Sequence, residues 1–96
     1  MIKFYKFYND AGHGWVAVKR KELVELGILD KISGFSYQKG NMVYLEEDCD
    51  ASLFVKKLKE LDITYGFTKK YCNYSPIRSY EHFKVDIKDI QLELAI

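Results

Sequence analysis

The sequence predicts an α+β protein, in which a small, mostly antiparallel sheet of about four or five strands carries two helices packed on one face. Short runs of aromatic and β-branched residues alternate with turn residues, which is typical of strands and hairpins. Residues 51–61 place apolar side chains at helical spacing. Residues 19–26 form a shorter amphipathic run before Gly27, and a glycine is common just past a helix C-terminus.

The N-terminal third predicts a hairpin and then a helix. Residues 2–8, IKFYKFY, predict a strand with one apolar face and with Lys3 and Lys6 on the other. Residues 9–14 combine two glycines with Asn and Asp, which favours a turn, and residues 15–18 resume as a strand. A helix of about two turns over residues 19–26 follows.

The centre of the chain holds its clearest hydrophobic pattern. Residues 35–38 and 42–46 predict strands on either side of a tight turn at residues 39–41. The helix over residues 51–61 comes next, and Asp48 or Asp50 is placed to accept hydrogen bonds as its N-cap. We expect much of the core to come from Tyr37, Val43, Tyr44, Leu45, Leu53, Phe54, Leu58 and Leu61.

The C-terminal third is less regular. Residues 63–68 alternate as a strand with one aromatic face, in which Gly66 marks a bulge or a close backbone approach. Residues 79–83 predict one helical turn. Residues 86–96 favour a final strand, with a helix as the alternative.

Size and charge limit the class of protein. The 96 residues predict a single α+β domain over residues 1–96. A net charge of +1 gives no global field toward nucleic acid or membrane. No apolar run is long enough for a membrane span, and the N-terminus lacks the apolar region of a signal peptide. We therefore expect a cytoplasmic protein with reduced thiols at Cys49 and Cys72, either a monomer or a small homo-oligomer.

Four carboxylates lie together between the last central strand and its helix: Glu46, Glu47, Asp48 and Asp50. Helix capping by one or two of them, with the rest solvated, is one interpretation. A surface that binds a basic partner is a second interpretation. A hard-cation site is a third, but the run lacks the loop glycine and the ligand spacing of a Ca²⁺ site, so we expect no metal.

A second candidate surface interleaves cations with aromatic rings: Lys69, Lys70, Tyr71, Tyr74, Arg78 and Tyr80. Such a combination suits a nucleotide or a single-stranded nucleic acid. An irregular loop held by its tyrosines is the alternative. His13, between Gly12 and Gly14, either belongs to a ligand loop with this surface or is a solvated turn residue.

Catalytic chemistry is not favoured by the sequence. A zinc site from Cys49, Cys72, His13 and His82 has no pair of residues at ligand spacing. Neighbouring carboxylates raise the pKa of the Cys49 thiol and oppose thiolate chemistry. We expect no enzyme and no cofactor.

Five motifs in order carry a resemblance: DAGHGW at residues 10–15, ELxxLGI at 22–28, SYQKG at 36–40, YLEEDCD at 44–50 and IRSYE at 77–81. Together they resemble a group of short proteins encoded by bacteriophages and conjugative or other mobile elements. The resemblance implies a cytoplasmic accessory protein that binds a host defence machine, as anti-CRISPR and antirestriction proteins do. It assigns no role to any residue.

These observations favour a non-enzymatic binding protein that inhibits a host-defence protein or protein–nucleic acid complex through its acidic and aromatic surface. The alternative is a nucleotide or single-stranded nucleic-acid binding module that uses the basic and aromatic residues between 69 and 84.

Overall fold

The computed structural model describes residues 2–86 and residue 89. Six strands form one sheet in the order β5-β1-β2-β4-β3-β6. They are β1 (Lys3–Asn9), β2 (Gly14–Lys19), β3 (Tyr37–Lys39), β4 (Met42–Glu46), β5 (Tyr65–Tyr71) and β6 (Glu81–His82). Among these described strands, only β1 and β5 pair in parallel. The predicted class is confirmed, with slightly more strands than expected.

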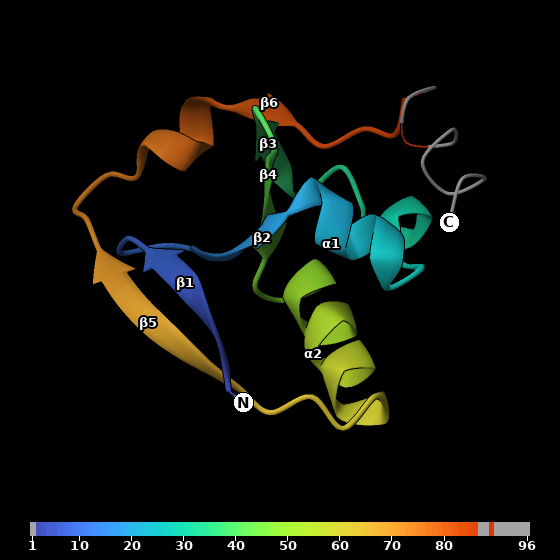
Figure 1. The fold of residues 1–96 in the computed structure, drawn as a ribbon. Helices are drawn as coiled ribbons and strands as arrows, with labels where there is room; N and C mark the ends of the chain where they lie inside the picture. The colour runs from blue at the N-terminus through green and yellow to red at the C-terminus, as the bar shows by residue number, and fades with distance from the viewer. Residues whose placement is uncertain (1, 87–88, 90–96) are drawn as a thin grey trace.

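Two α-helices, α1 (Arg20–Glu25) and α2 (Asp50–Glu60), lie on the same side of the sheet (Figure 1). Alternate residues of the central strands, such as Val16 and Val43, point toward them and pack with Phe54 in one buried cluster. The ring of Tyr5 meets that of Phe54 edge-on at a centroid distance of 5.0 Å. The core therefore lies between the sheet and the helices, because the helices and strands such as β4 turn their apolar faces toward it. The central strand β2 is buried on both faces.

Two tight turns follow from local sequence, as predicted. Gly40 and Asn41 connect β3 to β4 directly, and Gly40 adopts a φ of 60° that a residue with a Cβ rarely accepts. Gly27 has a φ of 71° and ends α1. The N–H of Ile28 then donates to the carbonyl of Leu23, and that of Gly27 to Val24, which closes the last turn.

The end of α2 explains an incorrect core prediction. Asp62 follows this helix in the left-handed region, with a φ of 55°. The N–H of Ile63 donates back to the carbonyl of Leu58, so the chain turns away at this point. Leu61 is consequently 49% exposed and lies outside the core, whereas Phe54 and Leu58 are buried as predicted.

The predicted N-cap of α2 is also wrong. Cys49 occupies the N-cap position and makes no side-chain cap hydrogen bond. Glu46 instead accepts from the N–H groups of Asp48 and Cys49, each at 3.0 Å, just before the helix begins. Asp50 lies inside the first turn and is directed toward the loop before β3.

Differences at the C-terminal end arise from long-range pairing. The seven-residue strand β5 continues to Tyr71, three residues beyond the predicted end, because it pairs with the whole of β1. The helical turn predicted at residues 79–83 is a 3-10 helix, η2, at Pro76–Ser79, followed by β6. Another 3-10 helix, η1, spans Leu29–Lys31. The predicted final strand falls on residues 86–96, of which all but Asp86 and Asp89 lie outside the described residues.

Candidate functional site

The side of the sheet opposite α1 and α2 is here called the helix-free face. Side chains alternate along each strand, and the registers between strands bring the outward sets together. The helix-free face consists of Phe4, Lys6, Tyr8, Trp15, Ala17, Lys19, Tyr37, Lys39, Met42, Tyr44, Glu46, Gly66, Thr68 and Lys70. This alternation separates two lysines that we expected on one side. Lys6 belongs to the helix-free face, whereas Lys3 lies 3.5 Å from Glu22.

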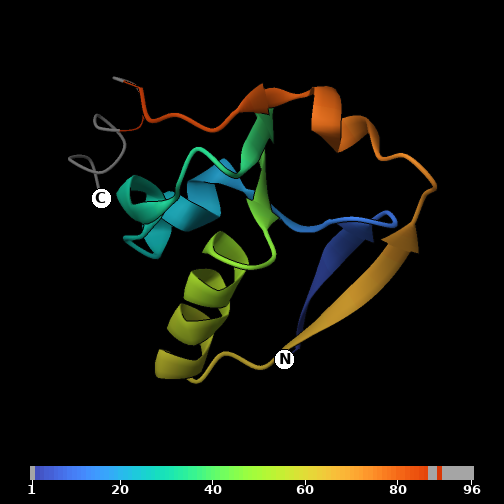
Figure 2. The same cartoon turned by 180° about the vertical axis from the view of Figure 1, so that it is seen from behind.

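Residues 72–80, the covering segment, arch over one end of this face between β5 and β6 (Figures 1 and 2). A buried carboxylate, Asp10, holds the segment in place. Its Oδ2 accepts from the Nε of Arg78 at 2.6 Å and from the N–H of Ser75 at 3.2 Å. Its Oδ1 accepts from the N–H groups of Gly12 and His13, each at 3.0 Å. Asp10 therefore joins the first hairpin turn to the covering segment.

The positive charge of Arg78 stabilises the ionised Asp10 carboxylate at this junction. The Arg78 guanidinium is the main cause that holds the pKa of Asp10 well below its usual range, and the backbone N–H groups of His13, Ser75 and Gly12 act in the same direction. Arg78 also lies over the rings of Trp15 and Tyr74, at 5.6 and 5.8 Å from their centroids. Its charge is thus already engaged within the protein.

Three tyrosines form a cluster at the centre of the helix-free face. The ring centroids of Tyr8 and Tyr44 are 6.2 Å apart, and those of Tyr44 and Tyr80 are 5.2 Å apart. Tyr80 belongs to the covering segment, and the Nζ of Lys39 lies 4.7 Å from its ring centroid. Burial is the main cause that raises the pKa of Tyr44. The cluster therefore offers neutral, half-buried rings beside a cation.

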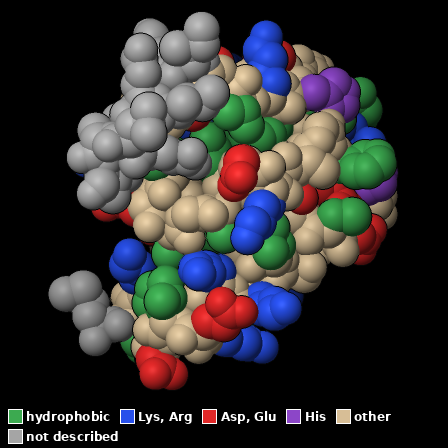
Figure 3. Space-filling model, turned by 90° about the vertical axis from the view of Figure 1, so that its right-hand side faces the viewer, with side chains coloured by type: hydrophobic (Ala, Val, Ile, Leu, Met, Phe, Trp, Pro, Cys, Tyr) green, Lys and Arg blue, Asp and Glu red, His purple; other side chains and the backbone are tan. Residues whose placement is uncertain are grey.

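Four exposed lysines surround this cluster: Lys6, Lys19, Lys39 and Lys70. Within the part of the chain that the structure describes, none of them lies within 4.0 Å of a carboxylate oxygen. Figure 3 views the opposite, helix-bearing side, where positive and negative side chains are interspersed. The helix-free face is therefore the more uniformly basic of the two.

Three grooves border the helix-free face in the part of the chain that the structure describes. The largest, of about 1190 Å³, lies beside Lys19, Lys39 and Tyr80, but its lining also includes the carboxylates of Glu81, Asp86 and Asp89. The other two lie at the tyrosine cluster.

The first groove at the tyrosine cluster, of about 550 Å³, lies where β1 and β2 separate beyond the Lys6–Ala17 pair, and Lys6, Lys19 and Tyr44 line it. The second, of about 290 Å³, has Lys70 and Tyr80 in its lining. Tyr8 and Tyr44 line both of these grooves. The arrangement can accommodate planar groups against the rings while the lysines meet negative charge.

The predicted basic and aromatic residues only partly come together. Lys70 and Tyr80 lie at the helix-free face, whereas Lys69 alternates to the other side of β5. Tyr71 is exposed at the end of β5 and lines the smaller groove, and Tyr74 is exposed in the covering segment. His13 is exposed in its turn, 6.1 Å from the ring of Trp15.

Sequence reasoning did not assign five residues to this site: Lys6, Tyr8, Lys19, Lys39 and Tyr44. The expectation that Tyr37 and Tyr44 belong to the core is wrong, because both lie on the helix-free face. The signal that could have found the five residues is the period of two along residues 4–8, 15–19, 37–39 and 42–46. Using it needed the order of the strands, which local pattern does not give.

The acidic run is smaller at the surface than predicted. Asp50 is only 4% exposed, so it does not belong to an acidic surface. Its carboxylate accepts from the N–H of Ser33 and from the hydroxyls of Ser33 and Ser36. Glu46 is occupied by the backbone N–H groups before α2, which leaves Glu47 and Asp48 as exposed carboxylates.

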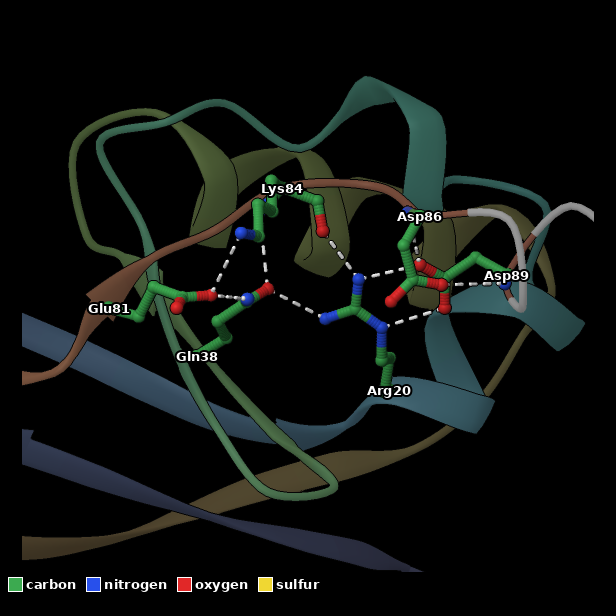
Figure 4. A network of polar contacts seen from close by, with 6 residues as sticks. All are labelled: Arg20, Gln38, Glu81, Lys84, Asp86 and Asp89. Carbon is green, nitrogen blue, oxygen red and sulfur yellow. Dashed lines mark hydrogen bonds and ion pairs between the residues drawn. The ribbon is translucent and has the colours of Figure 1, made fainter.

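A further polar network ties the end of the described chain to the start of α1 (Figure 4). Arg20 donates from Nε to Asp89 at 2.7 Å and also donates to Gln38 and to the carbonyl of Lys84. The hydrogen bonds and charge of Arg20 lower the pKa of Asp89 from its usual value. Asp89 is buried, so we interpret this pair as structural.

The described residues give no support for a metal site or a reactive thiol. Within residues 2–86 and 89, no three His, Cys, Asp or Glu side chains gather as metal ligands. Local desolvation and the nearby carboxylates of Glu46 and Asp50 raise the pKa of the Cys49 thiol, as the sequence indicated. Among the helices of that part of the chain, none is long and apolar enough to cross a membrane. No protein family, curated protein or solved structure gives a significant match to this chain.

Proposed function

We propose that this protein binds single-stranded nucleic acid on its helix-free face and catalyses no reaction there. The observation that carries the proposal is the cluster of Tyr8, Tyr44 and Tyr80 surrounded by four lysines that have no carboxylate partner among the described residues. Aromatic rings stack on bases without regard to sequence, and lysines track the backbone phosphates.

A single strand fits these features better than a duplex. In a duplex the faces of the bases are stacked on one another, so a protein ring reaches them only after they have been unstacked. Tyr44 and Tyr80 line grooves that are open to solvent, and Lys39 lies over the Tyr80 ring. A splayed base can approach these rings while its phosphates meet Lys6 or Lys70.

Salt dependence gives a quantitative expectation. Each phosphate neutralised on a single strand contributes about 0.7 to the slope of log affinity against log salt. Four lysines that each meet one phosphate predict a slope of about −2.8, and removing three of them reduces it to about −0.7. The remaining affinity then comes mainly from stacking.

Fluorescence anisotropy with labelled oligo-dT and oligo-U tests the proposal. The test variant replaces Lys6, Lys19 and Lys39 by Gln. The matched control replaces Lys31, Lys56 and Lys59, which are exposed elsewhere, and changes the net charge equally. We expect the test variant to lose most of its affinity and the control to keep it. Equal loss in both variants, or no binding by the natural sequence at low salt, contradicts the proposal.

A second candidate is protein binding through the exposed pair Glu47 and Asp48. It follows from the acidic run and from the resemblance to proteins of mobile elements. In its more specific version, the partner is a host-defence complex that this chain inhibits, as an anti-CRISPR or antirestriction protein does. Affinity capture from the bacterial host, followed by mass spectrometry, compares Glu47→Lys/Asp48→Lys with Glu25→Lys/Glu60→Lys. A partner lost only with the first variant supports this candidate, and a partner retained by both excludes it.

A further inference from the structure

The two edges of the sheet differ. β6 is an edge strand of two residues, too short to pair extensively with another chain. β5, at the other edge, has seven residues and contains no proline. Phe67 and Tyr71 on this strand are 39% and 63% exposed. The edge at β5 is therefore long and partly apolar, and a second strand can pair with it.

Hydrogen bonds to β1 fix which groups of β5 remain available. The N–H of Lys3 donates to the carbonyl of Thr64 at 2.9 Å, and the N–H of Cys72 donates to the carbonyl of Asn9 at 3.0 Å. In a parallel pair the residues that bond to the neighbour alternate along the strand. The backbone N–H and C=O groups of the even-numbered residues of β5 thus point toward β1. Those of the odd-numbered residues point away from the sheet: Tyr65, Phe67, Lys69 and Tyr71.

We propose that a second copy of this chain pairs with β5 as an antiparallel strand, around a two-fold axis that passes beside Thr68. This register places Tyr65 opposite Tyr71 of the other copy, and Phe67 opposite Lys69. All four are residues whose backbone groups point outward, so each opposed pair exchanges both of its hydrogen bonds. The interface is isologous and closes as a dimer.

Charge selects this register over its neighbours. Like charges directly opposite one another destabilise an antiparallel pair. Centred on Thr68, Lys69 meets the Phe67 ring and Lys70 meets Gly66, so no lysine faces a lysine. Centring the pair on Lys69 instead opposes Lys69 to itself, and centring it on Phe67 leaves Tyr71 unpaired. Only the Thr68 register uses all seven residues of β5.

The proposed dimer goes beyond nucleic-acid binding and does not depend on it. Its sheet runs without a break from one copy into the other, and the even-numbered side chains Thr68 and Lys70 stay on the helix-free face. The two helix-free faces then lie side by side across the two-fold axis.

A cysteine at the axis tests the register. Thr68 opposes itself as a non-hydrogen-bonded pair, with its two Cα atoms about 4.5 Å apart, which is within disulfide range. In a background with Cys49 and Cys72 changed to Ser, we expect Thr68→Cys to form a disulfide-linked dimer under mild oxidation. The matched control is Thr64→Cys, an exposed residue on the same chain segment that lies far from its own copy in this register. Equal cross-linking of both variants, or none with Thr68→Cys, overturns the proposal.

Sedimentation of the unmodified protein provides an independent test. Lys69→Pro removes an outward N–H that β1 does not use, so it should yield monomers that remain folded by circular dichroism. Lys69→Ala keeps that N–H and should leave the dimer intact. A natural sequence that stays monomeric across a wide concentration range, or a Lys69→Pro variant that is folded and as dimeric as the natural protein, overturns the proposal.

Discussion

Asp10 and Arg78, sixty-eight residues apart, form a 2.6 Å ion pair that fastens the covering segment to the first hairpin. This pair decides the shape of the helix-free face, because Tyr80 lies just beyond Arg78 and completes the tyrosine cluster. The residues that organise this face are thus distinct from those proposed to contact a ligand.

The Asp10 pair predicts a stability that depends on pH. The folded-state pKa of Asp10 is lowered, so its contribution is present above the unfolded-state value of about 3.9 and is lost as pH falls through that value toward the lower folded pKa. Chemical denaturation at a series of acidic pH values should show a shallower fall in unfolding free energy for Asp10→Asn than for the natural sequence. Asp30→Asn, at an exposed position, should retain the natural slope. Identical slopes for Asp10→Asn and the natural protein would show that the pair does not set this dependence.

The buried network around Asp50 leads us to expect that removing the Ser36 hydroxyl lowers the unfolding free energy. Ser36 is fully buried, donates to Asp50 and accepts from the N–H of Glu46 at 3.0 Å. Ser36→Ala leaves both groups short of a partner, so we expect a loss of about 1–3 kcal/mol in unfolding free energy. Ser79→Ala, at an exposed site, provides the control. A Ser36→Ala protein as stable as this control would contradict the buried network.

Asp62 predicts a stabilising substitution. It adopts a φ of 55° just past α2, where glycine has no steric penalty and a negative charge opposes the helix dipole. Asp62→Gly should raise the unfolding free energy by about 1 kcal/mol. Thermal unfolding measures the difference, and Lys59→Gly, within the helix, should have the opposite sign. Destabilisation by Asp62→Gly would be inconsistent with the left-handed turn.

Two substitutions of Tyr80 distinguish stacking by its ring from hydrogen bonding by its hydroxyl. Tyr80→Phe keeps the ring beside Lys39 and should retain affinity for oligo-U. Tyr80→Ala should weaken binding by about 1–3 kcal/mol, the usual contribution of one stacked base. Phe35→Ala, an exposed aromatic outside the helix-free face, should have no effect in the same anisotropy titration. If Tyr80→Phe weakens binding as much as Tyr80→Ala, the hydroxyl rather than the ring is responsible.

Local features of the fold were predictable from the sequence. The first hairpin, the Lys39–Met42 turn and α2 depend on residues close together in the chain, whose periodicity and turn chemistry are visible directly. Gly27 ends α1 as predicted for the same reason. The N-cap of α2 was not predictable, because Asp50 bonds to Ser33 and Ser36 in a loop that precedes it by a full hairpin.

Long-range features were the ones that local pattern could not supply. The parallel pairing of β1 with β5 brings Lys70 beside Tyr8, and the covering segment brings Tyr80 onto Tyr44. Lys70 and Tyr80 were therefore recognised as candidates without the residues that surround them. Arg78 has the right chemistry for a ligand site, but the buried Asp10 carboxylate already occupies it.

The most direct test of the helix-free face is an NMR titration of the tyrosine ring protons with oligo-U at low salt. Bases that stack on the cluster should shift the ring signals of Tyr44 and Tyr80 and leave that of Tyr5, packed under the helices, unchanged. Rings that do not respond at saturating oligonucleotide, or shifts confined to the helix-bearing side, would contradict the account.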